Sequence, residues 1–177
     1  MILLMGLAGT GKGTQGKLLA ELHGMRLISM GDVVREYASE NQRDRMLAGD
    51  LLADDETIDM LDQFLASLDD EHEVILDGFP RSVPQAEWLL KQVQAGRFDV
   101  RLAFHLLASR EALKQRLLAR GRADDNDEVI AKRFDEYDKS TAPLLKWLED
   151  HGIDVVNVDA ERPVDVIQAE MVQQLQQ

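Results

Sequence analysis

Short apolar runs alternate along the chain with longer stretches in which apolar residues recur at helical spacing. Apolar runs bounded by turn residues are typical of strands buried on both faces, whereas recurrence at every third or fourth position predicts an amphipathic helix. The pattern predicts strands over residues 2–5, 26–28, 74–76, 101–106 and 154–158. It predicts helices over residues 14–23, 32–38, 54–68, 84–94, 110–119, 127–149 and 164–175.

This alternation of strands and helices indicates the fold class. It is typical of α/β proteins in which helices cover both faces of a parallel sheet. We therefore expect a three-layer, doubly wound fold with a five-stranded parallel sheet, formed by a single domain over residues 1–177. Ligands of such sheets bind beyond the carboxyl ends of the strands, so the residues that follow each strand are the candidates for chemistry.

Two segments interrupt the alternation, namely residues 30–60 and 120–126. Both are candidates for mobile pieces over the ligand-binding edge. Helix signals support the other divisions, because Pro84 suits a first helical turn and Ser109 is a favourable N-cap. Pro143 is expected to kink the helix predicted over residues 127–149.

The loop after the first strand is rich in glycine. Residues 6–14 read Gly-Leu-Ala-Gly-Thr-Gly-Lys-Gly-Thr, directly between an apolar run and a helical stretch. Such a turn directs backbone N–H groups and the positive end of a helix at an anion, and Lys12 adds a mobile charge. The spacing is that of a phosphate-binding P-loop, except that Gly13 separates the lysine from the hydroxyl of Thr14. The alternative is a glycine-rich turn with a surface lysine.

A second candidate site follows the strand predicted over residues 74–76. Asp77 ends this strand and places a carboxylate near the glycine-rich loop, where it can hold the hydration shell of a magnesium ion. Gly78 permits a close approach of the backbone, and the following Phe-Pro pair stiffens the exit so that Arg81 projects at a fixed place. The alternative is an ordinary turn with a solvated arginine.

Several arginines lie at the ends of elements, and they form the third candidate site. Arg116 and Arg120 are spaced i, i+4 at the end of a predicted helix, where cations are also favoured for purely structural reasons. Arg122 and Arg133 flank the Asp124-Asp125 loop, so one hinged segment could bring both onto a polyphosphate. Phosphoryl transfer requires charge neutralisation and in-line alignment, which arginines, a lysine and magnesium supply.

Composition narrows the class of ligand and the compartment. The net charge of −13 argues against a general nucleic-acid binder, so arginines gathered in one cleft suggest a small anionic ligand. The chain contains no cysteine, which excludes disulfides and cysteine-ligated zinc. No apolar run approaches the ~18 residues of a membrane span, and no signal peptide is evident, so we expect a cytoplasmic protein.

Four motifs in order resemble the adenylate kinase family of nucleoside monophosphate kinases, in its short-lid form. They are the loop at residues 6–15, Ser-Met-Gly-Asp-Val-Val-Arg at 29–35, Asp-Gly-Phe-Pro-Arg-Ser-Val-Pro-Gln at 77–85 and Gly-Arg-Ala-Asp-Asp-Asn at 121–126. The resemblance covers residue 1 to about residue 160, and this family has a glycine directly after the loop lysine. It implies a P-loop fold with an acceptor-binding segment at about 30–60 and a short lid at about 120–133.

The resemblance also implies a role for each matching residue. The phosphates of ATP would be cradled by Gly9, Thr10, Gly11, Lys12, Gly13 and Thr14, with Arg116 stacked on the adenine. The acceptor nucleotide would be bound by Ser29, Met30, Arg35, Gly78, Arg81 and Gln85, of which Gln85 reads the adenine. The transferring group would be contacted by Lys12, Arg81, Arg120, Arg122 and Arg133, and Asp77 would hold Mg²⁺ through water with Thr14 nearby.

This chain departs from the family pattern at three places. Ala8 replaces a usual proline, Met30 replaces a threonine that commonly faces the acceptor base, and the stretch over residues 35–49 is shortened. Either Met30 lies against the acceptor base, where a thioether donates no hydrogen bond, or its side chain points into the core. Gln85 favours AMP as acceptor.

These observations support three functional hypotheses. The first is transfer of the γ-phosphoryl group of MgATP to a nucleoside monophosphate, with AMP as the expected acceptor. The alternatives are a kinase of small-molecule hydroxyl groups, such as shikimate or gluconate, with Asp32 as base, and a non-catalytic nucleotide-binding module. For the first we expect a monomer that uses magnesium without zinc and binds neither nucleic acid nor membranes.

Overall fold

The computed structural model describes residues 1–48, 52–68, 72–122 and 124–176. Its five strands are β1 (Ile2–Met5), β2 (Arg26–Ser29), β3 (Val74–Asp77), β4 (Leu102–Leu107) and β5 (Val155–Asp159). They form one parallel sheet in the order β2-β3-β1-β4-β5, which confirms the predicted sheet. The central strand β1 places Leu3 opposite Leu76 of β3 and Ala103 of β4.

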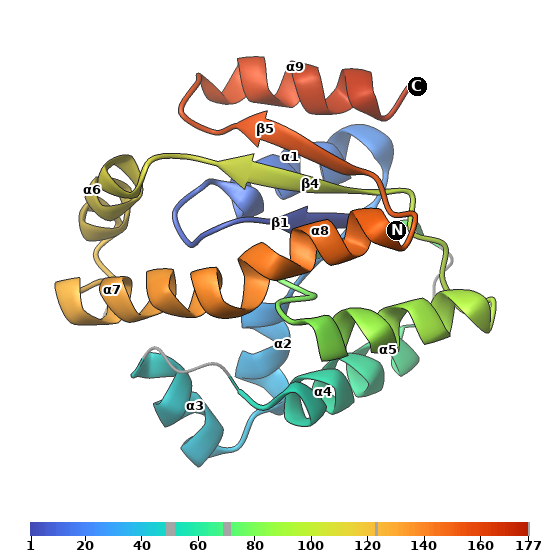
Figure 1. Cartoon of the computed structure of the whole chain (residues 1–177), viewed down its shortest axis with the longest axis horizontal. Coiled ribbons are helices and arrows are strands. Elements are labelled where there is room, and N and C mark those ends of the chain that lie inside the picture. Colours follow the sequence, from blue (N-terminus) through green and yellow to red (C-terminus); the bar gives the residue numbers. More distant parts are fainter. Residues whose placement is uncertain (49–51, 69–71, 123, 177) are drawn as a thin grey trace.

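Helices cover both faces of this sheet, as Figure 1 shows. The side chains of Ile2 and Leu4 pack with α1 (Lys12–His23) and α9 (Val164–Gln174) on one face. Leu3 and Met5 point to the opposite face, because successive strand residues alternate. That face is covered by α2 (Met30–Tyr37), α4 (Asp54–Ala66), α5 (Val83–Gln94) and α8 (Ala142–Asp150).

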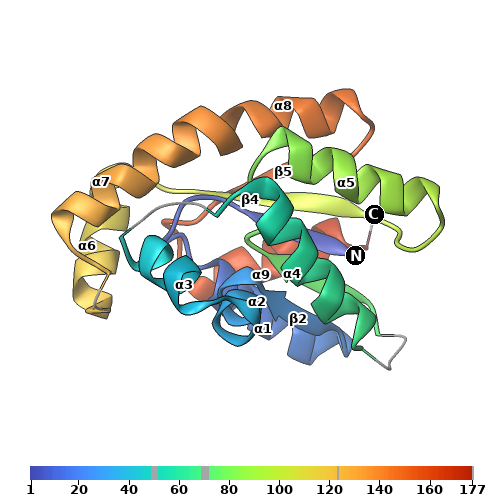
Figure 2. The ribbon, with the colours of Figure 1, turned by 90° about the horizontal axis from the view of Figure 1, so that it is seen from below.

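A third, smaller cluster lies beyond the carboxyl end of the sheet. Leu113 and Leu117 of α6 (Arg110–Arg120) pack there against Ile130 and Phe134 of α7 (Asp127–Glu136). Both views place α6 and α7 at the same end of the molecule as α3 (Glu40–Leu47) (Figures 1 and 2). The predicted acceptor-binding and lid segments are therefore at the same end as the candidate site, although residues 49–51 and 123 within them lie outside the described residues.

The helix predicted over residues 127–149 is confirmed as one continuous helical segment, with an irregularity close to Pro143 as expected. The structure divides this stretch into α7, a π-helical turn η1 (Tyr137–Thr141) and α8. Pro143 lies in the first turn of α8 and has no N–H to continue an α-helical ladder, while the N–H of Ala142 bonds the carbonyl of Tyr137, five residues back. The distortion expected at the proline is therefore a π-helical turn, which holds one residue more than an α-helical turn and lies just before Pro143.

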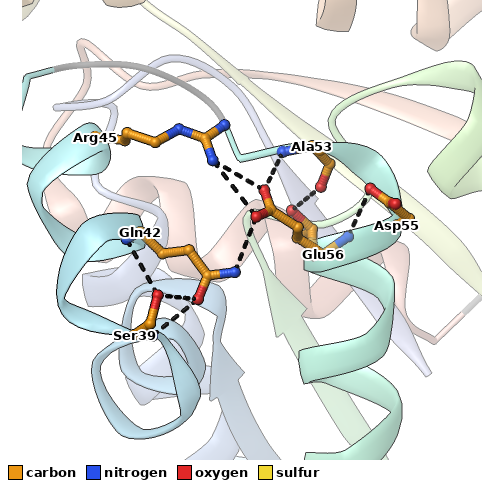
Figure 3. A network of polar contacts seen from close by, with 7 residues as sticks. Ser39, Gln42, Arg45, Ala53, Asp55 and Glu56 are labelled. Atoms are coloured by element: carbon orange, nitrogen blue, oxygen red, sulfur yellow. Dashed lines mark hydrogen bonds and ion pairs between the residues drawn. The ribbon is translucent and has the colours of Figure 1, made fainter.

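Helix α3 was not predicted, although its N-terminus carries a recognisable signal. The side-chain oxygen of Gln42 accepts from the N–H of Ser39 at 2.8 Å, and the N–H of Gln42 donates to the hydroxyl oxygen of Ser39 at 3.4 Å, which together form a capping box (Figure 3). The amide of Gln42 also donates to Glu56 at 3.1 Å, and Arg45 pairs with the same carboxylate at 3.3 Å. Because the carboxylate of Glu56 accepts from the N–H of Ala53 as well, this network ties α3 to the start of α4.

Candidate active site

A cavity of about 690 Å³ opens at the carboxyl ends of the parallel strands. Its walls come from the loop after β1, the starts of α1 and α2, the loop after β3, and α6, α7 and η1. The sequence-predicted residues that line it are Gly9, Gly11, Lys12, Gly13, Thr14, Ser29, Arg35, Asp77, Gly78, Arg81, Arg116, Arg120, Arg122 and Arg133. The edge expected from the fold class therefore holds most of the candidate chemistry.

The glycine-rich loop needs its glycines for conformation and for space. Gly11, the N-cap of α1, has a φ of 90°, in the left-handed region that side chains disfavour. Gly6 has a φ of 132°, and a Cβ there would lie 2.4 Å from the carbonyl oxygen of Leu106. The first turn of α1 carries no acidic residue and Gly11 offers no capping side chain, so the N–H groups of this turn remain available for an anion.

Lys12 bonds to its own loop. Its ammonium group donates to the carbonyl oxygens of Gly6 at 2.8 Å and Leu7 at 2.9 Å. Burial lowers the pKa of Lys12 to about 8, with Asp77 acting in the opposite direction and Arg81 and Arg120 lowering it further. The lysine is therefore a desolvated cation, and an anionic ligand would relieve the cost of its burial.

Asp77 faces this lysine from the end of β3. Within the described part of the chain its carboxylate makes no hydrogen bond or ion pair, and burial raises its pKa while Lys12 and Arg81 oppose the shift. A Cβ on Gly13 would lie 3.7 Å from the Asp77 Oδ2 atom, so α1 begins close to the carboxylate. The described residues include no cluster of three or more histidine, aspartate or glutamate side chains suited to a metal.

Arg81 is fixed from several directions. Its Nε donates to the carbonyl oxygen of Gly78 at 2.8 Å, and its own carbonyl accepts from the hydroxyl of Thr141 at 3.0 Å. Its backbone N–H donates to the amide oxygen of Gln85 at 2.8 Å. The bond to Gly78 holds the guanidinium at the cavity, and the other two hold the backbone of Arg81. Burial lowers the pKa of Arg81, and Asp77 opposes that shift.

Two further arginines at the cavity are neutralised by the acidic pair in the loop between α6 and α7. Arg120 binds the fully buried carboxylate of Asp125 through two contacts, of 2.8 and 2.6 Å. Arg133 pairs with Asp124 and lies 3.7 Å from Asp125. The contacts with Arg120 lower the pKa of Asp125, and the N–H of Arg122 contributes to the same shift. Carboxylates thus occupy positions that a phosphate could take.

Arg35 is an exposed arginine that lines the cavity. Arg35 on α2 pairs with Asp32 one turn earlier, and both side chains are largely exposed. Ser29 and Gly31 line the cavity next to this pair. Arg35 is therefore placed to reach an anion across the mouth of the cavity.

Three sequence-predicted residues do not line the cavity. The side chain of Met30 is buried in the core with Val33 and Val34, so the structure favours the second of the two alternatives considered for it. Gln85 is buried, and its amide donates to Asp54 at 2.8 Å. The hydroxyl of the buried Thr10 donates to the carbonyl of Leu7 at 2.9 Å, which stabilises the loop from within.

Sequence reasoning missed part of the cavity wall. Glu136, Tyr137 and Thr141 line it, and all three follow Arg133 on the same continuous helical segment. Their spacing of three to eight residues from Arg133 was the available signal, because residues about one turn apart share a helix face.

The described helices include none with the length and apolar character needed to cross a bilayer.

The chain is similar to known proteins along most of its length. A family model described as adenylate kinase matches residues 4–153. The adenylate kinase of Synechococcus sp. (strain WH7803) is 37% identical over 172 residues, which cover 94% of this chain and 93% of that protein. The adenylate kinases of Mycobacterium bovis (strain BCG / Pasteur 1173P2) and Mycobacterium ulcerans (strain Agy99) are 39% and 38% identical, over 94% and 98% of this chain and 93% and 98% of their own.

The pair of Arg120 with Asp125 yields a testable prediction about stability. The substitution Asp125→Asn should lower the free energy of unfolding by about 1–3 kcal/mol at neutral pH, because it removes charge-assisted hydrogen bonds to a buried carboxylate. The pKa of Asp125 is lowered in the folded protein, so its contribution is full above the ordinary carboxyl range and is lost as pH falls through the folded value. Urea unfolding at about pH 7 and about pH 3 should show the difference shrinking in acid.

Asp150→Asn is the matched control. Asp150 pairs with Lys146 on the exposed surface of α8, so its substitution should change stability by less than about 0.5 kcal/mol. Equal effects of the two substitutions at neutral pH would show that Asp125 contributes no more than a surface charge.

Proposed function

The chain belongs to the adenylate kinase family, and we propose that it transfers the γ-phosphoryl group of ATP to AMP, with ADP as both products. The observation that carries the proposal is the convergence of Lys12, Arg81, Arg120 and Arg133 on one cavity beside the glycine-rich loop. An array of cations that meets a phosphate loop at a single cavity suits a substrate pair with several phosphates.

The reaction needs little covalent chemistry from the protein. A phosphate oxygen of AMP forms a bond to the γ-phosphorus, and the bond from that phosphorus to the bridging oxygen of ATP breaks. The attacking oxygen is already ionised at neutral pH, so no general base is required. The contribution of the protein is to align the two phosphates and to neutralise the charge that builds up between them.

Lys12 changes partners in this proposal. The loop N–H groups from Gly9 to Thr14 bind the phosphates of ATP, and Lys12 leaves the carbonyls of Gly6 and Leu7 to bond the outer phosphates. The surrounding positive charge and the burial of Lys12 favour this exchange, because a phosphate oxygen satisfies the ammonium better than two neutral carbonyls. Arg116 stacks on the adenine of ATP.

Arg81 from the loop after β3 and Arg35 from α2 together hold the phosphate of AMP. The support of Arg81 by Gly78, Gln85 and Thr141 keeps its guanidinium in place before the ligand arrives. Gln85 serves the acceptor side by holding the backbone of Arg81. Asp54 fixes Gln85 in turn, because its carboxylate accepts from the amide of Gln85 and from the hydroxyl of Ser82 at 2.5 Å. In this proposal residues 30–60 form the acceptor-binding segment.

The loop and helix over residues 120–133 form the lid. Arg120, Arg122 and Arg133 bind the transferring phosphoryl group in exchange for Asp124 and Asp125. A segment shifts on ligand binding only through contacts that differ between its two states, and these arginine pairs provide such contacts.

Magnesium fits the carboxylate of Asp77 and the hydroxyl of Thr14. Mg²⁺ keeps several waters and binds one or two carboxylates together with substrate phosphates, and Asp77 is a cavity-lining carboxylate with no other partner among the described residues. When bound, the ion supplies further neutralisation of the phosphate charge. We place the protein in the cytoplasm as a monomer, with no nucleic-acid or membrane partner, in accord with its net charge of −13.

Removal of Lys12 tests the proposed activity. Lys12→Ala should lower the kcat for ADP formation from ATP and AMP by at least ~100-fold, because the lost charge acts on the migrating group. The melting temperature should remain close to that of the wild type. Lys91→Ala, a lysine outside the cavity lining, is the control and should retain full activity. A kcat within about fivefold of wild type in folded Lys12→Ala would contradict the assignment.

Removal of Arg81 tests the division between donor and acceptor sides. Arg81→Ala should raise the KM for AMP and lower kcat, each by roughly tenfold or more, while the Kd for ATP changes little. Arg97→Ala is the control, since Arg97 pairs with Asp62 outside the cavity. Titration calorimetry with ATP and separate acceptor kinetics give the two values. Loss of ATP affinity with an unchanged KM for AMP would reverse the assigned sides.

The burial of Met30 predicts what a threonine would do there. Met30→Thr should lower the free energy of unfolding by about 1–3 kcal/mol, because it leaves a cavity and buries a hydroxyl group. The ranking of AMP, CMP, GMP and UMP as acceptors should stay the same. Steady-state kinetics with the four monophosphates and urea unfolding check both parts. A sharpened preference for AMP would show that this side chain reaches the acceptor base.

A further inference from the structure

A chain of hydrogen-bonded polar side chains joins the sheet to the wall of the cavity, and no proposed step uses it. His105 on β4 is 6% exposed, and its Nδ1 atom lies 2.8 Å from the amide oxygen of Asn157 on the neighbouring strand β5. Its Nε2 atom lies 2.5 Å from the hydroxyl of Tyr137, and the two rings are nearly parallel, with their planes 17° apart. Two strands of the core are thereby joined to the first residue of the π-helical turn.

The partners determine which imidazole nitrogen carries the proton. An amide oxygen only accepts, so Nδ1 donates to Asn157, and in the neutral ring Nε2 is left to accept from the Tyr137 hydroxyl. Burial lowers the pKa of His105, and Lys12 adds to that shift while Asn157 opposes it, so the ring is neutral at pH 7. Burial likewise raises the pKa of Tyr137 to about 12, which keeps its hydroxyl a donor.

Tyr137 is one of several anchors of η1. The N–H of Ala142 bonds the carbonyl of Tyr137, and this contact defines the π-helical turn. At the other end of the turn the hydroxyl of Thr141 bonds the carbonyl of Arg81, and between them Asp138 pairs with Arg110 of α6. The turn is therefore held against the sheet, the acceptor-side arginine and α6 at once.

The extra residue in this turn decides where Arg133 points. Each residue of an α-helix advances the chain by about 100° around the axis, so a return to regular α-helix would rotate α7 by that amount relative to α8. Arg133 lies one turn before Tyr137 on α7 and enters the cavity from this direction. A rotation of that size would carry its guanidinium away from the phosphates.

We propose that His105 is a positioning residue for phosphoryl transfer, which as a neutral hydrogen-bond acceptor holds Tyr137 and the π-helical turn so that Arg133 faces the cavity. The claim that this anchoring positions Arg133 for phosphoryl transfer rests on the proposed function. The anchoring of the turn by His105 is independent of that function and can be measured without turnover.

The first experiment measures the anchor alone. Tyr137→Phe and His105→Leu should each speed hydrogen exchange of the Ala142 amide by roughly tenfold or more, with the amides later in α8 unchanged. His105→Gln, which keeps an acceptor near the position of Nε2, should restore most of the protection. Unchanged exchange at Ala142 in both Tyr137→Phe and His105→Leu would overturn the proposal.

The second experiment measures positioning through Arg133. Tyr137→Phe and His105→Leu should each lower kcat by roughly tenfold, the double variant should be no worse than either single one, and His105→Gln should approach wild type. In an Arg133→Ala background, Tyr137→Phe should cost nothing further. His151→Leu, the same substitution at the exposed end of α8, is the control and should leave kcat unchanged.

The possible outcomes separate the two claims. A full tenfold loss from Tyr137→Phe in the Arg133→Ala background would show that the turn does not act through Arg133, and this would overturn the positioning role. An unaltered kcat in active Tyr137→Phe would do the same. A wild-type protein that forms no ADP from ATP and AMP would overturn the proposed function instead, and the exchange data would still decide whether His105 holds the turn.

Discussion

The structure depends on gathering several positive charges at one edge of the sheet. Lys12 and Arg81 are half-buried there, and Arg120 and Arg133 reach the same cavity from α6 and α7. Cations without partners in such a place would be costly, because burial removes part of their hydration. Acceptors come from the loops around the cavity: backbone carbonyls from the loops after β1 and β3, and carboxylates from the loop between α6 and α7. Asp77 at the end of β3 adds negative charge close by.

These acceptors satisfy the cations within the protein itself. The carbonyls of Gly6 and Leu7 hold Lys12, and Asp125 holds Arg120 with a geometry that resembles the two-point grip of an arginine on a phosphate. In the proposed function, binding a nucleotide replaces these internal partners by phosphate oxygens. The affinity of the site would then be a difference between two sets of interactions, and Asp124 and Asp125 would set the cost of breaking the first set.

Much of the fold and part of the site could be predicted because both are encoded by short-range patterns. The apolar runs that became β1 and β3 lie inside the sheet, and a parallel sheet with helices on both faces is the arrangement that buries such strands. The glycine-rich loop and the Asp77–Arg81 turn follow strands directly, so the fold class alone brings them to one edge. Helix α3 was missed because its eight residues show little amphipathic pattern, and its support comes from Glu56 on another helix.

The sequence by itself determined which residues alternate between strand and helix, which loop can hold phosphates and which arginines are available to a polyphosphate. These are local properties, since they depend on side-chain period, on glycine spacing and on position relative to a strand end. The tertiary structure decided that Met30 lies in the core and that Gln85 bonds Asp54 and the Arg81 backbone. It also decided that a π-helical turn lies between α7 and α8, within the helix predicted over residues 127–149. Each of these depends on partners far away in the chain, such as His105 for Tyr137 and Arg81 for Thr141, and no local pattern specifies which of several possible partners a side chain meets when the layers pack.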